Sequence, residues 1–300
     1  MKLFAPKYYK NFSCIADKCS HSCCIGWEID IDGETDRRYR LFNDGYGKII
    51  KDSIDRSETP HFVLGENERC PHLDEKGLCR IITELGDDCL CEICREHPRF
   101  YNTSSLGREV GLGMACEEAA RIILLSDEYD AFEEIGEVCG EPCEKELDTV
   151  HMREKIYSVL KNGCLSYAEK LEKIYEEFNA SPKITDDEDW RNLISELEYL
   201  DDSHRELFLH YSSDAHPSEI HEKKAERALA YFVFRHCTAA NDEEEYRAIL
   251  IFCLFLCKLF ASVLKVDESV SPETFARIIS EEIEYSEDNT ERIINEIYFV

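Results

Sequence analysis

The hydrophobic and polar positions of the chain follow two different patterns, and the change falls near residue 145. From Asp148 onward, apolar residues recur every three or four positions in long segments with few glycines, as in SYAEKLEKIYEEF, which is typical of amphipathic helices. Before that point, short apolar stretches are interrupted by loops that contain glycine, proline and cysteine. We therefore expect a mainly α protein, with a cysteine-rich region containing a few short strands at 1–145 and a helical region at 146–300.

Two long helices dominate the predicted helical region. They cover Ser218–Ala239 and Asp242–Val266, and the second is apolar nearly all round, so we expect it to be central. Its apolar run, Ala248–Cys257, ends at Lys258 and is far shorter than the roughly 20 residues that a membrane-spanning helix needs. It is interpreted as a core helix and not as a membrane anchor. A further helix should begin at Ser271–Pro272, because serine is a favoured cap and proline a favoured first helical residue.

Shorter elements are predicted in the N-terminal region. The alternation of apolar and polar residues over Trp27–Ile31 indicates a short strand, and a helix should start just after it. A second strand is expected around His61–Leu64, and a helix over Cys79–Leu85. The glycine-containing segment Glu109–Leu125 should end as a helix.

The charge of the chain narrows the classes of partner. With 64 acidic and 35 basic side chains, the formal net charge is −29. This charge repels nucleic acid and anionic membranes. It either attracts a basic or lysine-bearing partner or serves only to keep the protein soluble. The hydrophobic fraction of 43% is enough for a packed core. The first residues, MKLFAPKYYKNFSC, contain no long apolar stretch or cleavage site, so we expect no signal peptide and a cytoplasmic protein.

The sixteen cysteines are the strongest chemical signal, because ten of them lie between Cys14 and Cys116. In a reducing compartment, dense cysteines indicate thiolate metal ligands rather than disulfides. A tight reversal at CPHLDEKGLC should bring Cys70 and Cys79 together. Adjacent cysteines point in different directions, so Cys23 and Cys24 do not easily bind one ion together. The candidate ligands are Cys14, Cys19, Cys23, Cys24, Cys70, Cys79, Cys94 and Cys116.

The spacing favours an iron-sulfur cluster over zinc. Tetrahedral zinc sites usually contain two short C-x2-4-C pairs, whereas iron-sulfur clusters accept thiolates from wider spacings. The candidate set lacks such paired knuckles, and cysteines far outnumber histidines, although His21, His72 and His97 keep zinc open as an alternative. The C-x3-C-x2-C arrangement is absent, since Gly26 stands where a third thiolate would follow Cys23.

The other cysteines are interpreted mainly as structural residues. Four of them lie in apolar helical contexts and should behave as small buried hydrophobic groups: Cys164, Cys237, Cys253 and Cys257. Cys139 and Cys143 lie on a predicted turn and are weaker metal candidates. Cys89 and Cys91 crowd Cys94 and are kept as secondary ligands.

Four segments together carry a resemblance to a known family. The chain resembles the flagellin lysine-N-methylase family in the order, spacing and flanking residues of its cysteine segments. These segments are CIADKCSHSCCIGWEIDID, CPHLDEKGLCRI, CREHPRF and CEEAARIIL. The cysteine region of that family is shared with the CxxCxxCC zinc- or iron-chelating proteins. The later segment YFVFRH also resembles the family, and the likeness is strongest over residues 8–125.

The resemblance implies a function that the spacing alone does not establish. It implies methyl transfer from S-adenosylmethionine to lysine side chains of flagellin or another lysine-bearing protein. It also implies an iron-sulfur cluster, of the 4Fe-4S type, held by the eight cysteines named above. Cys89 and Cys91 depart from the family's pattern, which has other residues at these positions. The alternative is a non-catalytic zinc- or iron-binding protein. The sequence contains no G-x-G-x-x-G after a strand, so it identifies neither a catalytic residue nor a residue that binds S-adenosylmethionine.

Overall fold

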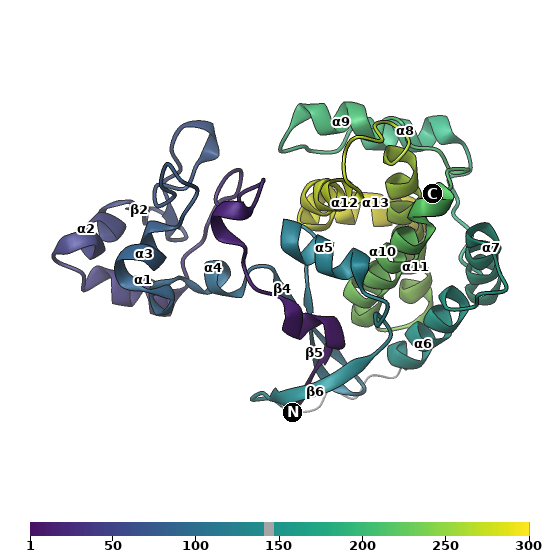
Figure 1. The fold of residues 1–300 in the computed structure, drawn as a ribbon, viewed down its shortest axis with the longest axis horizontal. Helices are drawn as coiled ribbons and strands as arrows, with labels where there is room; N and C mark the ends of the chain where they lie inside the picture. The colour runs from purple at the N-terminus through teal and green to yellow at the C-terminus, as the bar shows by residue number, and fades with distance from the viewer. Residues whose placement is uncertain (141–146, 300) are drawn as a thin grey trace. The chain divides into compact units, whose positions relative to one another are not determined.

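The computed structural model describes residues 1–140 and 147–299 (Figure 1). Helices predominate and the strands are short, so the predicted mainly α fold is confirmed. The chain divides into two compact units. The cysteine unit is Ser13–Pro98, and the helical unit joins Met1–Phe12 to Arg99–Val300.

The helical unit contains a four-stranded sheet and the longer helices. Its strands are β1 (Lys2–Pro6), β4 (Arg99–Ser104), β5 (Gly107–Leu112) and β6 (Phe132–Glu137). Its α-helices are α5 (Glu117–Leu125), α6 (Thr149–Leu160), α7 (Tyr167–Phe178), α8 (Asp187–Ser195), α9 (Asp202–Phe208), α10 (Glu222–His236), α11 (Glu243–Val263), α12 (Pro272–Ile279) and α13 (Glu287–Phe299). Short 3-10 helices are η1 (Lys7–Asn11), η5 (Glu219–His221) and η6 (Cys237–Ala239), and η7 (Ser280–Glu284) is a π-helix.

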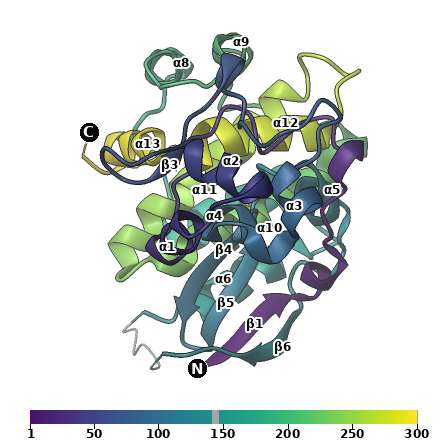
Figure 2. The ribbon, with the colours of Figure 1, turned by 90° about the vertical axis from the view of Figure 1, so that its left-hand side faces the viewer.

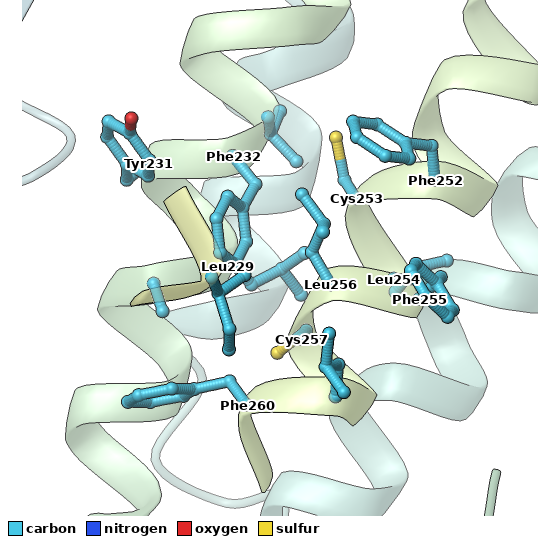
Figure 3. Close-up of a cluster of buried hydrophobic side chains, with 14 of the residues drawn as sticks. Leu229, Tyr231, Phe232, Phe252, Cys253, Leu254, Phe255, Leu256, Cys257 and Phe260 are labelled. Carbon is cyan, nitrogen blue, oxygen red and sulfur yellow. The ribbon is translucent and has the colours of Figure 1, made fainter. Parts of the chain in front are cut away.

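Helix α11 forms the centre of the helical core, as predicted. It is long and apolar enough to cross a membrane, but 94% of its apolar window is buried inside the protein. Figure 3 shows Cys253 and Cys257 of α11 among the buried side chains that it shares with α10, including Phe232 and Leu229. The Asp242 side chain caps its first turn by accepting two backbone N–H bonds. The helix therefore packs as a core element of this unit.

The sheet joins strands that are far apart in the sequence. Its order is β4-β5-β1-β6, with β1 parallel to β5 and antiparallel to β6, and β1 between these two is visible in Figure 2. Segment Glu109–Leu125 does end as a helix, α5, but its beginning belongs to β5. The expected boundary near residue 145 does not coincide with the observed division at residues 12 and 98. The physical reason is that β6 pairs with β1, and α5 packs against α10 and α12, so these elements belong with the later helices.

The cysteine unit is built from short elements. They are η2 (Ala16–Lys18), α1 (Gly33–Arg40), α2 (Gly45–Asp52), β2 (Ile54–Asp55), β3 (His61–Phe62), η3 (Glu66–Glu68), α3 (Arg80–Leu85), η4 (Asp87–Cys89) and α4 (Glu92–Glu96). The helix expected after Ile31 is α1, whose cap Asp32 accepts the Thr35 N–H at 2.9 Å. The strand expected over Trp27–Ile31 is reduced to an isolated bridge between Asp30 and His61.

The cysteine unit has its own small hydrophobic core. Ile31, Tyr39, Ile50 and Phe62 are buried there, and several cysteines pack against them. Short helices and two-residue strands bury little apolar area, and small cores of this kind often depend on a metal or another cross-link. The core of this unit is therefore the part of the molecule where a metal centre would contribute most to folding.

Candidate metal centre

The loop between Cys70 and Cys79 reverses the chain as predicted. The Asp74 side chain accepts the Leu78 N–H at 2.8 Å, and Gly77 has a φ of +77°, in the left-handed region that glycine favours. Cys70 is 5% exposed, and Cys79 stands half-buried directly before α3. The reversal therefore places both thiols in the core of the cysteine unit.

The adjacent cysteines of the first segment differ in environment, which agrees with their expected divergence. Cys23 is exposed, whereas Cys24 is half-buried and packs against the core. The Cys24 carbonyl oxygen accepts the Cys70 N–H at 2.8 Å, which ties the first cysteine segment to the second. A charge on Cys23 opposes the ionisation of Cys70 and Cys79 and so contributes to the raised pKa of both thiols.

The third cysteine segment is held against α1 by hydrogen bonds. The Arg38 guanidinium donates to the Asp88 and Leu90 carbonyl oxygens at 2.8 and 3.1 Å, and the Tyr39 hydroxyl donates to the Cys89 carbonyl oxygen at 2.6 Å. These bonds fix the backbone just before α4. Cys91, the next residue, is consequently 0% exposed.

Cys91 and Cys94 form a coupled pair of thiols. A hydrogen bond from the Cys94 thiol lowers the pKa of Cys91, and the same bond, with burial, raises the pKa of Cys94 well above its ordinary value. Of these two thiols, Cys91 is therefore the one whose ionisation the pair favours, and the thiolate is the form that binds metals. The sequence interpretation kept Cys91 only as a secondary ligand, although Cys91 and Cys94 have the C-x2-C spacing of a metal-binding knuckle.

Thiols from all three segments influence one another electrostatically. Burial raises the pKa of Cys70 to about 11, and the neighbouring charges of Cys79, Cys91 and Cys23 oppose its ionisation further. The pKa of Cys94 is likewise raised by the charge of Cys70 in addition to the bond from Cys91. Thiols that disfavour each other's ionisation are strongly stabilised as thiolates by a positive ion.

The donor set of this region is dominated by sulfur. His72 is buried in the same unit, but its two ring nitrogens lie within hydrogen-bond distance of the Tyr46 hydroxyl (2.9 Å) and the Ser53 hydroxyl (3.0 Å). Burial lowers the pKa of His72 to about 4, so its ring is neutral and structural. Among the residues that the structure describes, no three His, Cys, Asp or Glu side chains are gathered closely enough to hold one ion. The thiols are neighbours, and their chemistry fits a thiolate-bound metal, but they do not form a ready ligand cage.

The remaining candidate ligands occupy other environments. Cys14 is exposed and Cys19 is half-buried, both in the first residues of the cysteine unit. Cys116 belongs to the helical unit, where it precedes α5 and packs against the helical core. The eight predicted ligands are therefore divided between the two units, with Cys116 alone in the second.

The cysteines interpreted as structural are mostly buried. Cys237, Cys253 and Cys257 are at most 1% exposed, which agrees with the prediction. Cys164 is exposed, so its interpretation as a buried group was wrong, because it lies on the turn that follows α6 rather than on a helix. Cys139 is exposed. The prediction of a turn at CGEPC and the position of its second cysteine, residue 143, lie outside the described residues.

Comparisons with known proteins support the resemblance seen in the cysteine segments. No family model matches the chain, and no solved structure matches it. The flagellar biosynthetic protein FliU of Salmonella muenchen is 32% identical over 126 residues, which cover 40% of this chain and 75% of that protein. Proteins named lysine-N-methylase from Salmonella choleraesuis and Salmonella typhimurium are also 32% identical over 126 residues, but the match spans only 31% of their length. The chain belongs to the flagellin lysine-N-methylase family.

Proposed function

We propose that this chain takes part in methylation of lysine side chains on a protein, with S-adenosylmethionine as the methyl donor and flagellin as the substrate. Two relatives carry the name lysine-N-methylase, and a third is named as a flagellar biosynthetic protein. The net charge of −29 suits the attraction of a lysine-bearing partner. The reaction forms a bond between the uncharged lysine nitrogen and the methyl carbon, while the carbon–sulfur bond breaks and its electron pair stays on sulfur. The ammonium must first give up its proton to a base.

We further propose that the cysteine unit holds an iron-sulfur cluster of the 4Fe-4S type. The observation that carries this proposal is that thiols from three separate segments pack in or against one small core. The residues in the best position to supply thiolates are Cys24, Cys70, Cys79, Cys91 and Cys94. Iron-sulfur clusters are held by four such thiolates. Cys91 is counted among the four because the hydrogen bond from Cys94 lowers its pKa, so the thiol left for another role is one of the other four.

The protein's own contribution to such a centre is to prepare and shield its ligands. The hydrogen bond within the Cys91–Cys94 pair favours a thiolate at Cys91, and the bonds from α1 hold the preceding backbone in place. Burial of Cys70 and Cys91 excludes water from the sulfur atoms, and solvent exposure is one of the factors that set the reduction potential of a cluster. When bound, a cluster would supply electron-transfer or Lewis-acid chemistry and would cross-link the short elements of this unit.

The proposed methylation is tested by incubating the anaerobically purified chain with flagellin and S-adenosylmethionine labelled in the methyl group. We expect label on lysine residues of flagellin, located by mass spectrometry of its peptides. Cys91→Ser should abolish the incorporation, whereas Cys164→Ser, an exposed thiol of the helical unit, should leave it unchanged. Absence of label on lysine with a chain that contains its full metal complement would contradict the proposal.

A second candidate function is non-catalytic metal binding, in which zinc or iron only stabilises the cysteine unit. It is favoured by the short match, because the shared segment spans 31% of the proteins named lysine-N-methylase. It is also consistent with the small apolar core of the unit. The two candidates differ in a simple observation: a colourless protein with stoichiometric zinc and no transfer of label supports the second, and a coloured protein with iron and sulfide supports the first.

A further inference from the structure

The helical unit contains a pocket of about 500 Å³, and no cysteine among the described residues lines it. Its lining comes from β4, the end of α10, the π-helix η7 and the first turns of α13. These segments are far apart in the sequence, so no short sequence motif predicts the pocket. Its chemistry divides into a charged floor, an apolar wall and an acidic rim.

The floor is a buried network centred on Glu284. The side chain of Glu284 is 0% exposed and accepts hydrogen bonds from His236 Nε2 at 2.7 Å and from the Tyr231 hydroxyl at 3.2 Å. Arg235 Nε lies 3.3 Å from the same carboxylate, and its guanidinium stacks on the rings of Phe100 and Tyr285. Glu284 is the last residue of the π-helix η7, and π-helical turns are often found at functional sites. The turn at η7 places a carboxylate below the pocket.

The charges of the floor balance one another. Burial opposes the charge of Glu284, but Arg235 and His236 hold the pKa of this carboxyl below its ordinary value. Burial lowers the pKa of His236 and so disfavours a charge on its ring. Within the floor, the Glu284 carboxylate faces the Arg235 guanidinium at 3.3 Å, and these two charges offset each other. The acidic residues that line the pocket outside this network are Glu287 and Glu291.

The rim carries two negative charges on α13. Glu287 and Glu291 both line the pocket, both are exposed, and they are four residues apart, so they share one face of the helix. Within the described residues, neither forms an ion pair with a lysine, arginine or histidine. Two like charges at this spacing disfavour each other unless a cation lies between them. The rim is therefore suited to a positively charged group.

The wall suits a flexible hydrocarbon chain. Phe100 and Ile294 contribute apolar surface. Asn102 also lines the pocket, and its amide nitrogen donates to the Phe234 and Arg235 carbonyl oxygens at 3.0 and 3.1 Å. The side-chain oxygen of Asn102 adds a hydrogen-bond acceptor to the lining of the pocket. An ammonium group has three N–H donors, and an apolar stem can pack on the aromatic and aliphatic wall.

We propose that this pocket binds a lysine side chain of a protein, with the ammonium group at Glu287 and Glu291 and the methylene stem against Phe100 and Ile294. The inference rests on the proposed function, since it names the place where the chain would receive the residue to be methylated. It assigns the recognition of substrate to the helical unit and leaves the metal chemistry to the cysteine unit.

Two small probes test the binding of the ammonium group on the full-length chain. The first is Nα-acetyl-lysine methylamide, and the second is Nα-acetyl-norleucine methylamide, which has a similar apolar stem but no charge. We expect calorimetric titration to detect the lysine probe and to show at least tenfold weaker binding of the norleucine probe. Glu287→Gln and Glu291→Gln should each weaken the lysine probe about three- to fivefold, as expected for partly exposed ion pairs. Asp288→Asn is the matched control, because this acidic neighbour on α13 is exposed and does not line the pocket.

The outcomes separate this inference from the proposed function. Equal binding of both probes, or a double Glu287→Gln/Glu291→Gln variant that binds the lysine probe like the parent chain, overturns the pocket assignment. If the chain binds the lysine probe through these carboxylates but transfers no label to any protein, the pocket stands and the methylation fails. If label is transferred and the double variant leaves the KM for the protein substrate unchanged, methylation stands and the pocket fails.

Discussion

Replacing Gly113 by alanine tests the packing that builds the pocket floor. Gly113 follows β5, and its φ lies outside the left-handed region, so an alanine can adopt its backbone conformation. An added Cβ, however, would lie 2.1 Å from the Tyr285 hydroxyl oxygen and 2.8 Å from Arg235 Nη1. Ordinary contacts of this kind begin near 3.4 Å, so both side chains would have to move. The perturbation is therefore steric. It acts on Arg235, which lies against Glu284, and on Tyr285, on whose ring the Arg235 guanidinium stacks.

The size of the effect follows from two opposing contributions. Inserting a methyl group into a packed site typically costs about 1–3 kcal/mol. Replacing glycine by alanine at a compatible backbone position offsets about 0.4–1 kcal/mol of this, because the unfolded chain loses conformational freedom. We expect Gly113→Ala to lower the free energy of unfolding by about 1–2 kcal/mol. The displaced Arg235 should also weaken binding of the lysine probe.

A matched substitution isolates the steric contribution. At Gly163 an added Cβ would meet no atom within 4 Å, so Gly163→Ala should stabilise the chain by about 0.4–1 kcal/mol. The chain has two tryptophans, and Trp190 is buried in the helical unit. Urea unfolding in a Trp27→Phe background, followed by the fluorescence of Trp190, therefore reports on the unit that contains both glycines. The reasoning is refuted if Gly113→Ala is as stable as Gly163→Ala with an unchanged denaturant slope.

Two further predictions concern buried charges. Arg153 and Glu109 form an ion pair of 2.7 Å, and their side chains are at most 3% exposed. Measured by urea unfolding, Arg153→Met alone should destabilise the helical unit by about 3–5 kcal/mol, because it leaves a buried charge unpaired, and adding Glu109→Leu should restore most of this stability. Equal stability of the single and double variants would exclude a coupled pair. Burial opposes the charge of Asp36, but the hydrogen bonds from Arg40 and Arg56 outweigh it and lower the pKa of this carboxyl. The carboxylate therefore stabilises the fold at any pH above the ordinary carboxyl pKa, and this stability is lost as the pH falls through the lower pKa of the folded state. Asp36→Asn should therefore reduce the loss of stability between neutral and acid pH, measured by thermal unfolding, and an unchanged pH dependence would contradict this account.

Helices with local signals were predictable from the sequence, and the sheet was not. Each of these helices has a capping residue, Asp242 or Ser271, only a few residues before its own apolar pattern begins. Because both signals are local, α11 and α12 begin where expected. Strand β6 has the sequence FEEIGE, and most of it is exposed, so it lacks the alternation that marks a strand. It forms because it pairs with β1, more than a hundred residues earlier in the chain. That non-local pairing is also the reason why the pattern change near residue 145 is not where the units divide.

The candidate metal centre was predictable in part for a similar reason. The turn residues of CPHLDEKGLC indicated that Cys70 and Cys79 meet, and the structure bears this out. The burial of Cys91 depends on bonds from α1, about fifty residues earlier, so its spacing to Cys94 was the one signal available in the sequence. The lysine pocket has no such signal, because its floor and rim are assembled from β4, α10, η7 and α13.

The content of iron and acid-labile sulfide in the anaerobically purified chain shows whether the cysteine unit holds a cluster. The account predicts about four iron and four sulfide per chain, a content that collapses in Cys91→Ser and persists in Cys164→Ser, whose thiol is exposed in the helical unit. A chain that contains neither iron nor sulfide, or a Cys91→Ser variant that retains the full content of both, would contradict it.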